Sequence, residues 1–536
     1  MSKNYNKRQA ETAAKTAASA ATQKKGKGSR KGLHFGGRTV YAVLGLLLLF
    51  FCVWEFSPVL RHLAEENYFS FEALPMAYVL REPLGHVLWI GRFLMLPFHW
   101  QWVGGLYLAA LLVISGWLAD KALACKAQWR GIGFVLPAML LAWASWRGYN
   151  LFLRNEPSLL ILWVWGLLIV SALAAGVKAL LRKKTAEKNA EEPVRWYKAG
   201  GLWLSTIALL AVIGGTYAFR QNVILSCDMQ NKMMDADWEG MVDDALAARQ
   251  PDRSVAAYHA IALNHQGQLL EHVFDIDYNY PTVKLDSIGG MDEGVNYIAE
   301  SNFHCGLVQS GYHYAMEQHV MGGPRLRFLK LMALTSMVND ERELCERYLH
   351  FIEKMPFEGE FCRYVRNLLG NAKAIADEPT FGRILQFLPR EQKFEQNFRT
   401  PPFLGYNVGV LSGTDETLNT SVAAALYSKD MENIIMRSQY LQQKRTLPLC
   451  VQQALVIASF KRPGLLDHFK DISSYVQNEV VNFASIAAPL SKDKSEKGKE
   501  AMRQALVKDW KGTYMFYYYC GNLNQTAQKQ TQTNVN

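Results

Sequence analysis

Hydrophobic and polar positions divide the chain into two unlike halves. Before about residue 220 the sequence contains long apolar runs, and beyond it apolar residues recur at helical spacing among charged ones. A helix needs about 20 consecutive apolar residues to cross a bilayer core. Five segments reach or approach that length and are predicted to span a membrane, namely 40–59, 103–118, 132–146, 158–180 and 200–218.

Aromatic residues lie near the ends of these runs. Tryptophan is enriched where a bilayer meets water, because its ring is apolar and its N–H is polar. The tryptophans near predicted span ends are Trp100, Trp102, Trp117, Trp129, Trp143, Trp146, Trp196 and Trp203. Pro137 falls inside the third segment, where neighbouring helices would have to satisfy the carbonyl that a proline leaves free. The pattern favours a transmembrane region of about five helices over 39–220.

One further apolar segment, 84–96, does not fit an ordinary span. It is short, and His86 and Arg92 interrupt it. We therefore expect a re-entrant or interfacial helix that leads into the second span. If it crossed the bilayer, the C-terminal half would lie in the cytoplasm.

Basic residues set the expected orientation. The net charge of +10 comes largely from lysines and arginines in 1–38 and 182–198, which flank apolar runs, whereas 61–81 carries Glu65, Glu66 and Glu72. Basic loops stay on the cytoplasmic side and contact anionic lipid headgroups. Five spans then give a cytoplasmic N-terminus and an external C-terminal domain, which is periplasmic in the inner membrane of a diderm bacterium. This placement of charge also argues against nucleic-acid binding.

Beyond residue 221 the apolar spacing predicts paired helices, at 295–321, 325–354 and 420–460. Turn signals separate them, at Gly322-Gly323-Pro324, Glu378-Pro379 and Arg462-Pro463-Gly464. Helix pairs that recur at about 35 to 45 residues are typical of a TPR-like α-solenoid. An irregular helical domain is the alternative.

The expected fold class is therefore all-α, with a multi-span transmembrane region followed by a soluble TPR-like α-solenoid. We expect a disordered basic cytoplasmic tail over 1–38, the spans over 39–220, the helical-repeat domain over 221–521 and a flexible polar end over 522–536.

Three short motifs carry a resemblance: FLMLPFHWQWVGGLY at 93–107, LPLCVQQAL at 447–455 and GTYMFYYY at 512–519. With the order of spans and helices, they resemble an uncharacterised family of Bacteroidota membrane proteins, domain of unknown function 6057. The resemblance covers most of the chain after the basic tail, although the long lysine-rich tail departs from it. It implies N-terminal spans before a helical-repeat tail and no known activity.

His304, Cys305, His313 and His319 form a dense group that raises a metal hypothesis. Residues nine apart on one helix point to opposite faces, so His304 and His313 share a site only if the helix breaks between them. Ordinary surface or core histidines are the favoured interpretation, and we expect no metal or cofactor.

Two Asp-x-Asp pairs have spacing that can hold a divalent cation, Asp235 with Asp237 and Asp275 with Asp277. Asp237 precedes the predicted helix that begins at Trp238, so an N-cap explains it more simply.

The cysteines and a late aromatic run also have simpler interpretations. Cys345 and Cys362 could be oxidised in a periplasmic domain, but buried free thiols are favoured for the soluble cysteines Cys227, Cys305, Cys345, Cys362, Cys450 and Cys520. Cys52 and Cys125 belong to the membrane region. The run Tyr514, Phe516, Tyr517, Tyr518 and Tyr519 could form a ligand platform, but packing of a last element is favoured.

The leading hypothesis is a scaffold that displays a helical-repeat domain for a protein or peptide partner, with no catalytic residue assigned. The alternative is a membrane-embedded transferase that acts on a lipid-linked substrate with Glu65 or Glu72 as a general base. Ordinary carboxylates of a solvated loop or interfacial helix are the favoured interpretation of Glu65, Glu66 and Glu72. Transport is disfavoured, because neither mid-span ionisable groups nor paired halves are evident.

Overall fold

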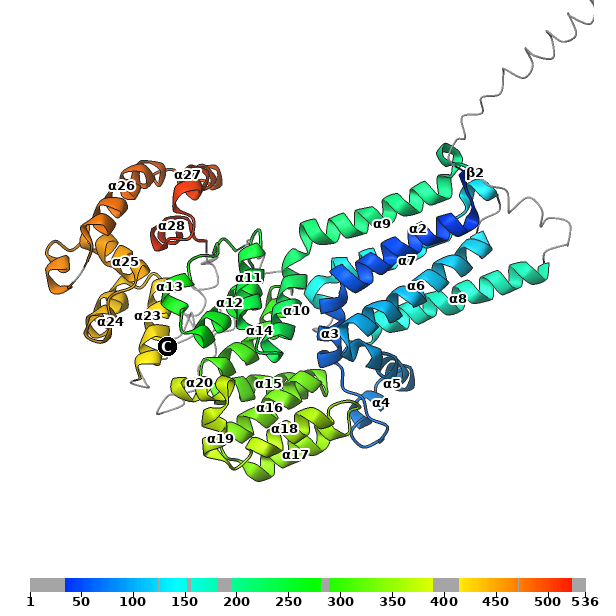
Figure 1. The fold of residues 1–536 in the computed structure, drawn as a ribbon, viewed down its shortest axis with the longest axis horizontal. Helices are drawn as coiled ribbons and strands as arrows, with labels where there is room; N and C mark the ends of the chain where they lie inside the picture. The colour runs from blue at the N-terminus through cyan, green and yellow to red at the C-terminus, as the bar shows by residue number, and fades with distance from the viewer. Residues whose placement is uncertain are drawn as a thin grey trace, which may run out of the picture.

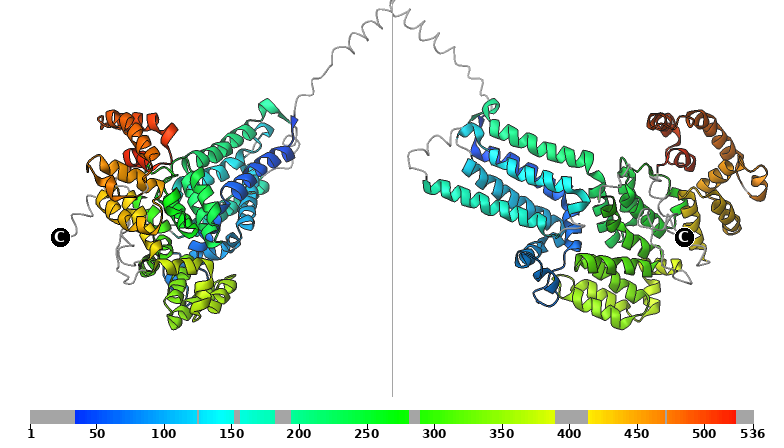
Figure 2. Two further views of the ribbon diagram at one scale, coloured as in Figure 1. Left: turned by 60° about the vertical axis from the view of Figure 1, so that its left-hand side comes forward. Right: turned by 180° about the vertical axis from the view of Figure 1, so that it is seen from behind.

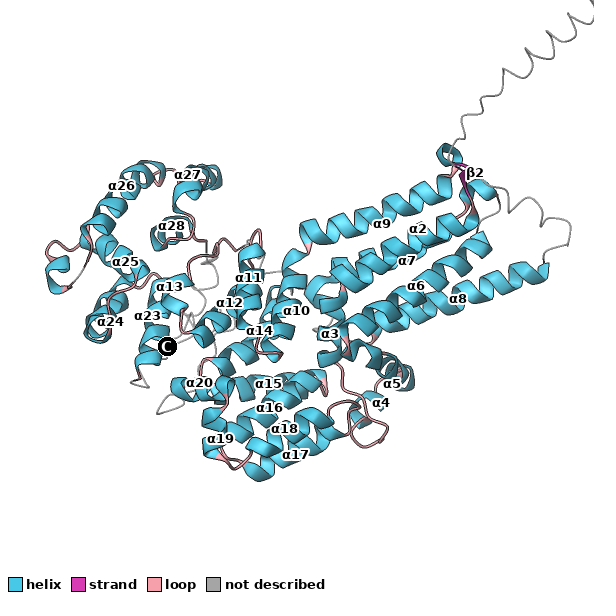
Figure 3. Cartoon of the chain, in the orientation of Figure 1, coloured by secondary structure: helices cyan, strands magenta, loops and turns pink. Residues whose placement is uncertain are grey.

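The computed structural model describes residues 34–123, 126–151, 156–181, 194–280, 289–388, 414–470 and 472–522. The described chain is almost entirely helical, and its one sheet is an antiparallel pair of two-residue strands (Figure 3). Residues 1–33 of the expected tail, all but one residue of the polar end, and Cys125 lie outside the described residues, whereas 34–38 form β1 and the start of the first helix. A bundle of long helices occupies one side of the molecule and the remaining helices the other (Figure 1).

The elements of the N-terminal half alternate long helices with short turns. They are β1 (His34–Phe35), α2 (Gly37–Phe50), η1 (Phe51–Glu55), α3 (Ser57–Glu66), α4 (Ala77–Leu80), α5 (Gly85–Leu94), η2 (Leu96–His99), α6 (Gln101–Leu123), η3 (Ala127–Trp129), η4 (Ile132–Phe134), α7 (Val135–Arg147), η5 (Gly148–Leu151), α8 (Leu159–Leu181), β2 (Val194–Arg195), η8 (Trp196–Lys198) and α9 (Gly200–Phe219).

Four of these helices are long and apolar enough to cross a membrane. They are Gly37–Glu55, which joins α2 to the π-helical turn η1, and α6, α8 and α9. Many of their large apolar side chains are exposed rather than buried against other helices, Leu173 and Ile207 among them. Helices that are apolar all round and exposed in this way are suited to lipid, so the protein is a helical membrane protein.

The third predicted span differs from the expectation. Within 132–146 the α-helix α7 has 13 residues, preceded by the 3₁₀ turn η4, and falls short of a span by length. Gly148, with φ of +54°, ends the helix after Arg147. Pro137 is the third residue of α7, where the backbone N–H has no intrahelical partner in any case, so no carbonyl is freed in mid-helix. The helix nevertheless packs in the bundle, against α6, α8 and α9.

One end of the bundle brings the chain start and two connections together. His34 pairs with Arg195 and Phe35 with Val194. In the same region Asp120, near the end of α6, accepts hydrogen bonds from the N–H groups of Gly131 and Gly133, at 2.8 and 3.3 Å. The close approach requires glycine, because a Cβ on residue 133 would lie 2.1 Å from the Asp120 nitrogen. We call this end the strand end; α2 starts from it (Figure 1).

The connection 56–100 stays at the opposite end. Helix α3 packs against both α6 and η2, so the chain leaves α2 and enters α6 in the same place. Helix α5, within the segment 84–96, has ten residues and packs against the beginning of α8. It is too short to cross a bilayer and both of its ends lie at this end of the bundle.

The second half continues directly from the last span. Its elements are α10 (Gln221–Met234), α11 (Trp238–Ala247), α12 (Arg253–Gln266), α13 (Leu269–His272), α14 (Gly289–His304), α15 (Val308–Gly322), α16 (Leu326–Val338), α17 (Arg342–Glu353), α18 (Gly359–Leu368), α19 (Ala372–Asp377), α20 (Pro379–Phe387), α23 (Asp415–Tyr427), α24 (Met431–Lys444), α25 (Leu449–Ser459), η9 (Leu465–His468), α26 (Ser474–Leu490), α27 (Glu496–Trp510) and α28 (Tyr514–Cys520).

Apart from α13 and α14, successive helices in this half pack against one another. The predicted pairs at 295–321 and 325–354 are confirmed as α14 with α15 and α16 with α17, whereas 420–460 contains three helices rather than two. All three turn signals fall at the boundaries of helical elements. The helices α23 to α28 curve away from the rest in all three views (Figures 1 and 2), and α28 closes back against α25, α26 and α27.

Candidate functional site

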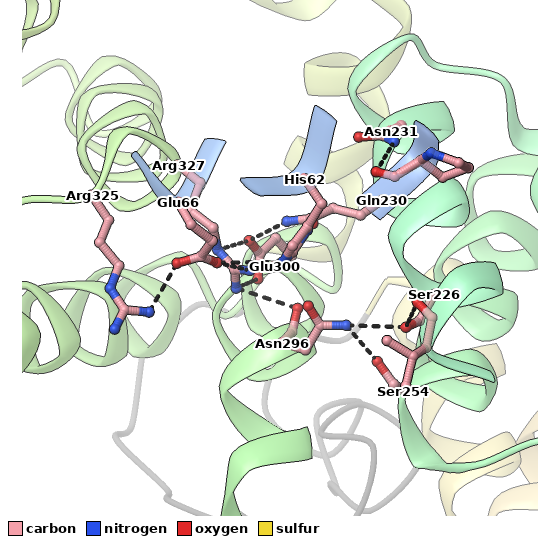
Figure 4. Close-up of polar contacts among 12 residues, drawn as sticks. His62, Glu66, Ser226, Gln230, Asn231, Ser254, Asn296, Glu300, Arg325 and Arg327 are labelled. Carbon is pink, nitrogen blue, oxygen red and sulfur yellow. Dashed lines mark hydrogen bonds and ion pairs between the residues drawn. The ribbon is translucent and has the colours of Figure 1, made fainter. Parts of the chain in front are cut away.

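A buried polar network lies where the membrane half meets the second half. Its residues come from α3, which follows the first span, from α10, which follows the last, and from α12, α14 and α16 (Figure 4). The two membrane-side helices pack against each other, and α3 also packs against α16. The helix after the first span and the helix after the last span therefore both contribute to one network.

Glu66 is the centre of this network, and its side chain is fully buried. Its Oε2 lies 2.8 Å from Nη1 of Arg325, and its Oε1 lies 2.8 Å from Nη1 of Arg327 (Figure 4). Burial alone would raise the pKa of Glu66, but the guanidiniums of Arg327 and Arg325 outweigh it and hold the pKa below its ordinary value. Glu66 is therefore an ionised carboxylate at neutral pH.

Arg327 joins a second carboxylate to the network. Its Nε lies 3.2 Å from Oε1 of Glu300 on α14. Burial raises the pKa of Glu300, and the attraction of Arg327 opposes that rise. Two guanidiniums and two carboxylates thus lie in one dry region, an arrangement that is tolerable only because each charge faces an opposite one.

His62 lies one helical turn before Glu66 and is neutral. Its Nε2 is 3.6 Å from Oε1 of Glu66, and its Nδ1 contacts the side-chain oxygen of Gln230. Burial lowers the pKa of His62 to about 4, more than the Glu66 carboxylate raises it. Gln230 in turn donates to Glu300 at 3.5 Å. His62 and Gln230 therefore connect the Glu66 carboxylate to the Glu300 carboxylate.

Uncharged side chains extend the network through the second half. The amide of Asn296 donates to Ser254 Oγ at 2.8 Å and to Ser226 Oγ at 3.3 Å (Figure 4). Tyr149, just after α7, lies 3.0 Å from the same Ser226 oxygen and donates to Asp252 at 2.8 Å. The connection after α7 is thereby tied to the N-terminus of α12, where Asp252 is the N-cap.

A second ionic cluster lies on the same junction. Lys330, one turn beyond Arg327 on α16, is 2.9 Å from Glu65 and 3.0 Å from Glu358. Arg92 of α5 pairs with Glu156 and donates to the carbonyl oxygens of Tyr68 and Pro324. The junction is therefore cross-linked by charge from three membrane-side segments.

These contacts decide what the predicted carboxylates can do. Glu65 and Glu66 lie on helix α3 and are buried, so the interpretation as solvated groups is wrong for both. Glu72 is more exposed and pairs with Lys354 at 2.5 Å. A carboxylate whose negative charge is stabilised by a cation is a poor proton acceptor, and this weakens the general-base hypothesis.

In the predicted histidine group, His304 contacts a histidine from outside the group. The helix is interrupted between His304 and His313, at Gly306 with φ of +86°. Nδ1 of His304 lies 2.9 Å from Nε2 of His265. Trp238 stacks on His265 with ring centroids 4.0 Å apart. Burial lowers the pKa of His304 to about 3. Among the described residues no three histidine, cysteine or acidic side chains are placed to hold a metal ion.

Both Asp-x-Asp pairs are divided between separate contacts. Asp237 is the N-cap of α11 and accepts from the Gly240 N–H at 3.0 Å, which confirms the N-cap interpretation. Its neighbour Asp235 accepts two hydrogen bonds from Arg61, each at 2.7 Å. Asp275 pairs with His272, and Asp277 pairs with Arg503.

The described cysteines are free thiols, and all but Cys520 are buried. The thiol of Cys345 faces the carbonyl of Ala333 and that of Cys362 faces the carbonyl of Leu349, so the suggested disulfide between them is wrong. The aromatic run forms α28, where Tyr514, Phe516 and Tyr517 are buried in the core, as expected for packing.

The sequence pattern did not single out the arginines and the lysine that pair with Glu65 and Glu66. Arg327 and Lys330 stand among leucine, phenylalanine and methionine in LRFLKLMALTSMV, the sequence of α16. A charged residue on an otherwise apolar helix is a signal of a buried partner. His62 gave no such signal, because its position beside Glu66 emerges only once α3 is known to be helical.

Of three comparisons with known proteins, one finds a match. Neither a curated protein nor a solved structure matches the chain. The model of a family of unknown function, DUF6057, matches residues 33–165 and 145–521, which together reach from the strand end to α28. The chain belongs to this family of unknown function, DUF6057.

Proposed function

We propose that the protein is a multi-pass inner-membrane scaffold that displays a periplasmic helical-repeat domain, residues 221–521, to a protein or peptide partner. The observation that carries the proposal is the position of this domain, which leaves the bundle at the end opposite the strand end. More basic residues of the bundle lie toward the strand end, Arg38, Lys126, Arg130, Arg195 and Lys198, than at the opposite end, where Arg147 and Arg220 end α7 and α9. Loops rich in basic residues stay in the cytoplasm.

An odd number of passes is needed for this topology, and α7 supplies the fifth. The stretch 131–151 extends along the bundle. Near its start Gly131 donates to Asp120 at the strand end, and near its finish Gly148 lies beside Val223 of α10, at the opposite end. With its flanking 3₁₀ turns this stretch is close to the roughly 20 residues of a span. Tightly packed neighbours allow such a helix to be short.

The stacking of helix pairs supports a repeat-type binding domain. α14, α15, α16 and α17 each pack on the next helix in the chain, and α23 to α26 do the same. Solenoids of paired helices commonly bind extended partners along one face. The transferase alternative has less support, because Glu65, Glu66 and Glu72 each face a lysine or arginine.

The topology is tested with a reporter fused after Asn536 that is active only outside the cytoplasm. We expect activity from this fusion and none from a matched fusion inserted after Lys126, in the loop beside the strand end. An inactive C-terminal fusion that is well expressed would place the domain in the cytoplasm and overturn the proposal.

The role is tested by complementation of a deletion strain. Glu72→Gln removes an exposed carboxylate without disturbing the core, and we expect full complementation. Glu65→Gln leaves Lys330 paired with Glu358 at 3.0 Å, so the cation keeps one carboxylate. If Glu65→Gln and Glu72→Gln are normally produced but inactive, the transferase hypothesis gains and the scaffold proposal loses.

A further inference from the structure

Helix α5 turns its charged side chain toward the protein. Arg92 is 2% exposed and is bound by Glu156 and by two backbone carbonyls. Beside it, a Cβ on Gly91 would lie 2.7 Å from the Ser158 hydroxyl and 2.8 Å from the Leu162 side chain. This face is therefore packed tightly against the beginning of α8.

The opposite face of α5 is exposed and mostly apolar. Val87, Ile90 and Phe93 recur at helical spacing and are each nearly half exposed, with His86 as the one polar side chain among them. Leu84, the residue before the helix, is 76% exposed, and Leu74 in the preceding turn is 83% exposed. A helix in water has the reverse arrangement, with its charges outside and its apolar stripe inside. An apolar outer face with a buried arginine is the arrangement expected beside lipid.

The helical domain extends this surface. Val320 and Met321, at the end of α15, are 68% and 60% exposed. They lie beside α4, since the Tyr78 hydroxyl donates to the Met321 carbonyl at 3.4 Å. A Cβ on Gly323 would meet the Tyr78 ring at 2.5 Å, so the two segments are in close contact.

The loop between α17 and α18 of the helical domain also lies beside the bundle, at the start of α6. Phe357, between α17 and α18, is about half exposed, and its ring centroid lies 4.6 Å from that of Trp100 at the start of α6. Trp102, two residues after Trp100, contacts Trp54 at the end of the first span, with ring centroids 6.5 Å apart. Tryptophans gathered where spans end mark the height of the membrane–water interface.

We propose that Leu74, Leu84, Val87, Ile90, Val320 and Phe357 form a membrane-surface platform that binds lipid of the leaflet on the side of the helical domain. The proposal rests on the multi-span function above and adds that the domain lies against the bilayer. Continuity argues for lipid as the occupant, because α5 packs on α8, whose outward residues are exposed and apolar. The bilayer that surrounds α8 is then the nearest apolar phase to the platform.

The test places a fluorescent label on single introduced cysteines of the full chain in phospholipid nanodiscs. The platform variants are Leu84→Cys, Val320→Cys and Phe357→Cys. Tyr440→Cys and Tyr475→Cys, on exposed positions of α24 and α26, serve as aqueous controls, and Leu173→Cys on α8 serves as the lipid control. The parent chain, treated with the same label, gives the background fluorescence. Its described cysteines other than Cys520 are buried.

We expect platform labels to be quenched by a lipid that carries a nitroxide near its headgroup, and to be several-fold less sensitive to aqueous iodide than the Tyr440 and Tyr475 labels. Iodide sensitivity equal to these controls would overturn the platform while the Leu173 label remained lipid-quenched, so the spans themselves would stand. Protection from both quenchers would also overturn it, because a second copy or another protein would then cover the surface.

Discussion

The substitution Glu66→Gln tests whether the junction depends on the buried carboxylate. Glu66 is fully buried and faces Arg325 and Arg327, each at 2.8 Å. Removing one partner of a buried ion pair costs about 3–5 kcal/mol, because the opposite charge stays buried without compensation. Arg327 would keep Glu300, which favours the lower part of this range. At roughly 2 °C per kcal/mol for a large domain, this lower part corresponds to a fall in melting temperature of about 6–8 °C.

The assay is thermal unfolding of the purified chain in detergent, followed by loss of helical signal. The matched control is Glu72→Gln, since the Glu72 side chain is 55% exposed and its pair with Lys354 lies at the surface. An exposed pair is worth about 0–1 kcal/mol, so the control should shift little. A Glu66→Gln shift no larger than that of the control would refute the reasoning.

The pH dependence supplies an independent check. The folded pKa of Glu66 lies below its ordinary value, so the carboxylate stabilises the fold above the unfolded pKa of about 4.3. That contribution is lost as the pH falls from there through the folded pKa. The stability difference between the parent chain and Glu66→Gln should therefore be largest at neutral pH and shrink in acid. A difference that grew in acid would contradict the ion-pair explanation.

Three further predictions follow from single sites. His259 is fully buried, neither ring nitrogen has a hydrogen-bond partner among the described residues, and burial lowers its pKa to about 3. Its neutral form is favoured in the fold, so His259 alone should cost the parent chain up to about 1.4 kcal/mol per pH unit below 6.5. The loss between pH 7 and pH 5, measured by denaturant unfolding, should therefore be smaller for His259→Leu than for the parent chain. Asp237→Ala removes the N-cap of α11 and should cost about 1 kcal/mol in the same assay, whereas Asp237→Asn should cost little. Cys345 and Cys362 should both react with a thiol reagent after denaturation without reductant, and mass spectrometry that found them cross-linked would contradict the free-thiol assignment.

The sequence predicted the helical elements well and their lengths less well. Apolar runs set the positions of α6, α8 and α9, because a span must be apolar along its whole length. The first span ends at Glu55, and Ser57 begins the separate helix α3, although the apolar run continues to residue 59. Composition alone could not reveal that break, since Pro58 and Val59 are buried in the junction rather than in lipid. The same ambiguity made 132–146 look like an ordinary span.

The candidate site was half visible in the sequence. The carboxylates Glu65 and Glu66 stood out, but their partners Lys330 and Arg325 lie about 260 positions away along the chain. No local pattern links residues so distant, and only the packing of α3 against α16 brings them together. His304 shows the same limit, because its partner His265 comes from a helix whose position the sequence did not fix.

The junction uses charge where apolar packing alone would also join two parts. An apolar contact is non-directional, whereas a guanidinium must meet a carboxylate oxygen along its N–H bonds. Arg325 and Arg327 take different oxygens of Glu66, so the carboxylate cannot turn without losing one of them. α3 follows the first span and α10 follows the last, so both chain exits are fixed in one network. The helical domain is thus held at a set angle to the spans, as the proposed platform and the proposed scaffold role both require.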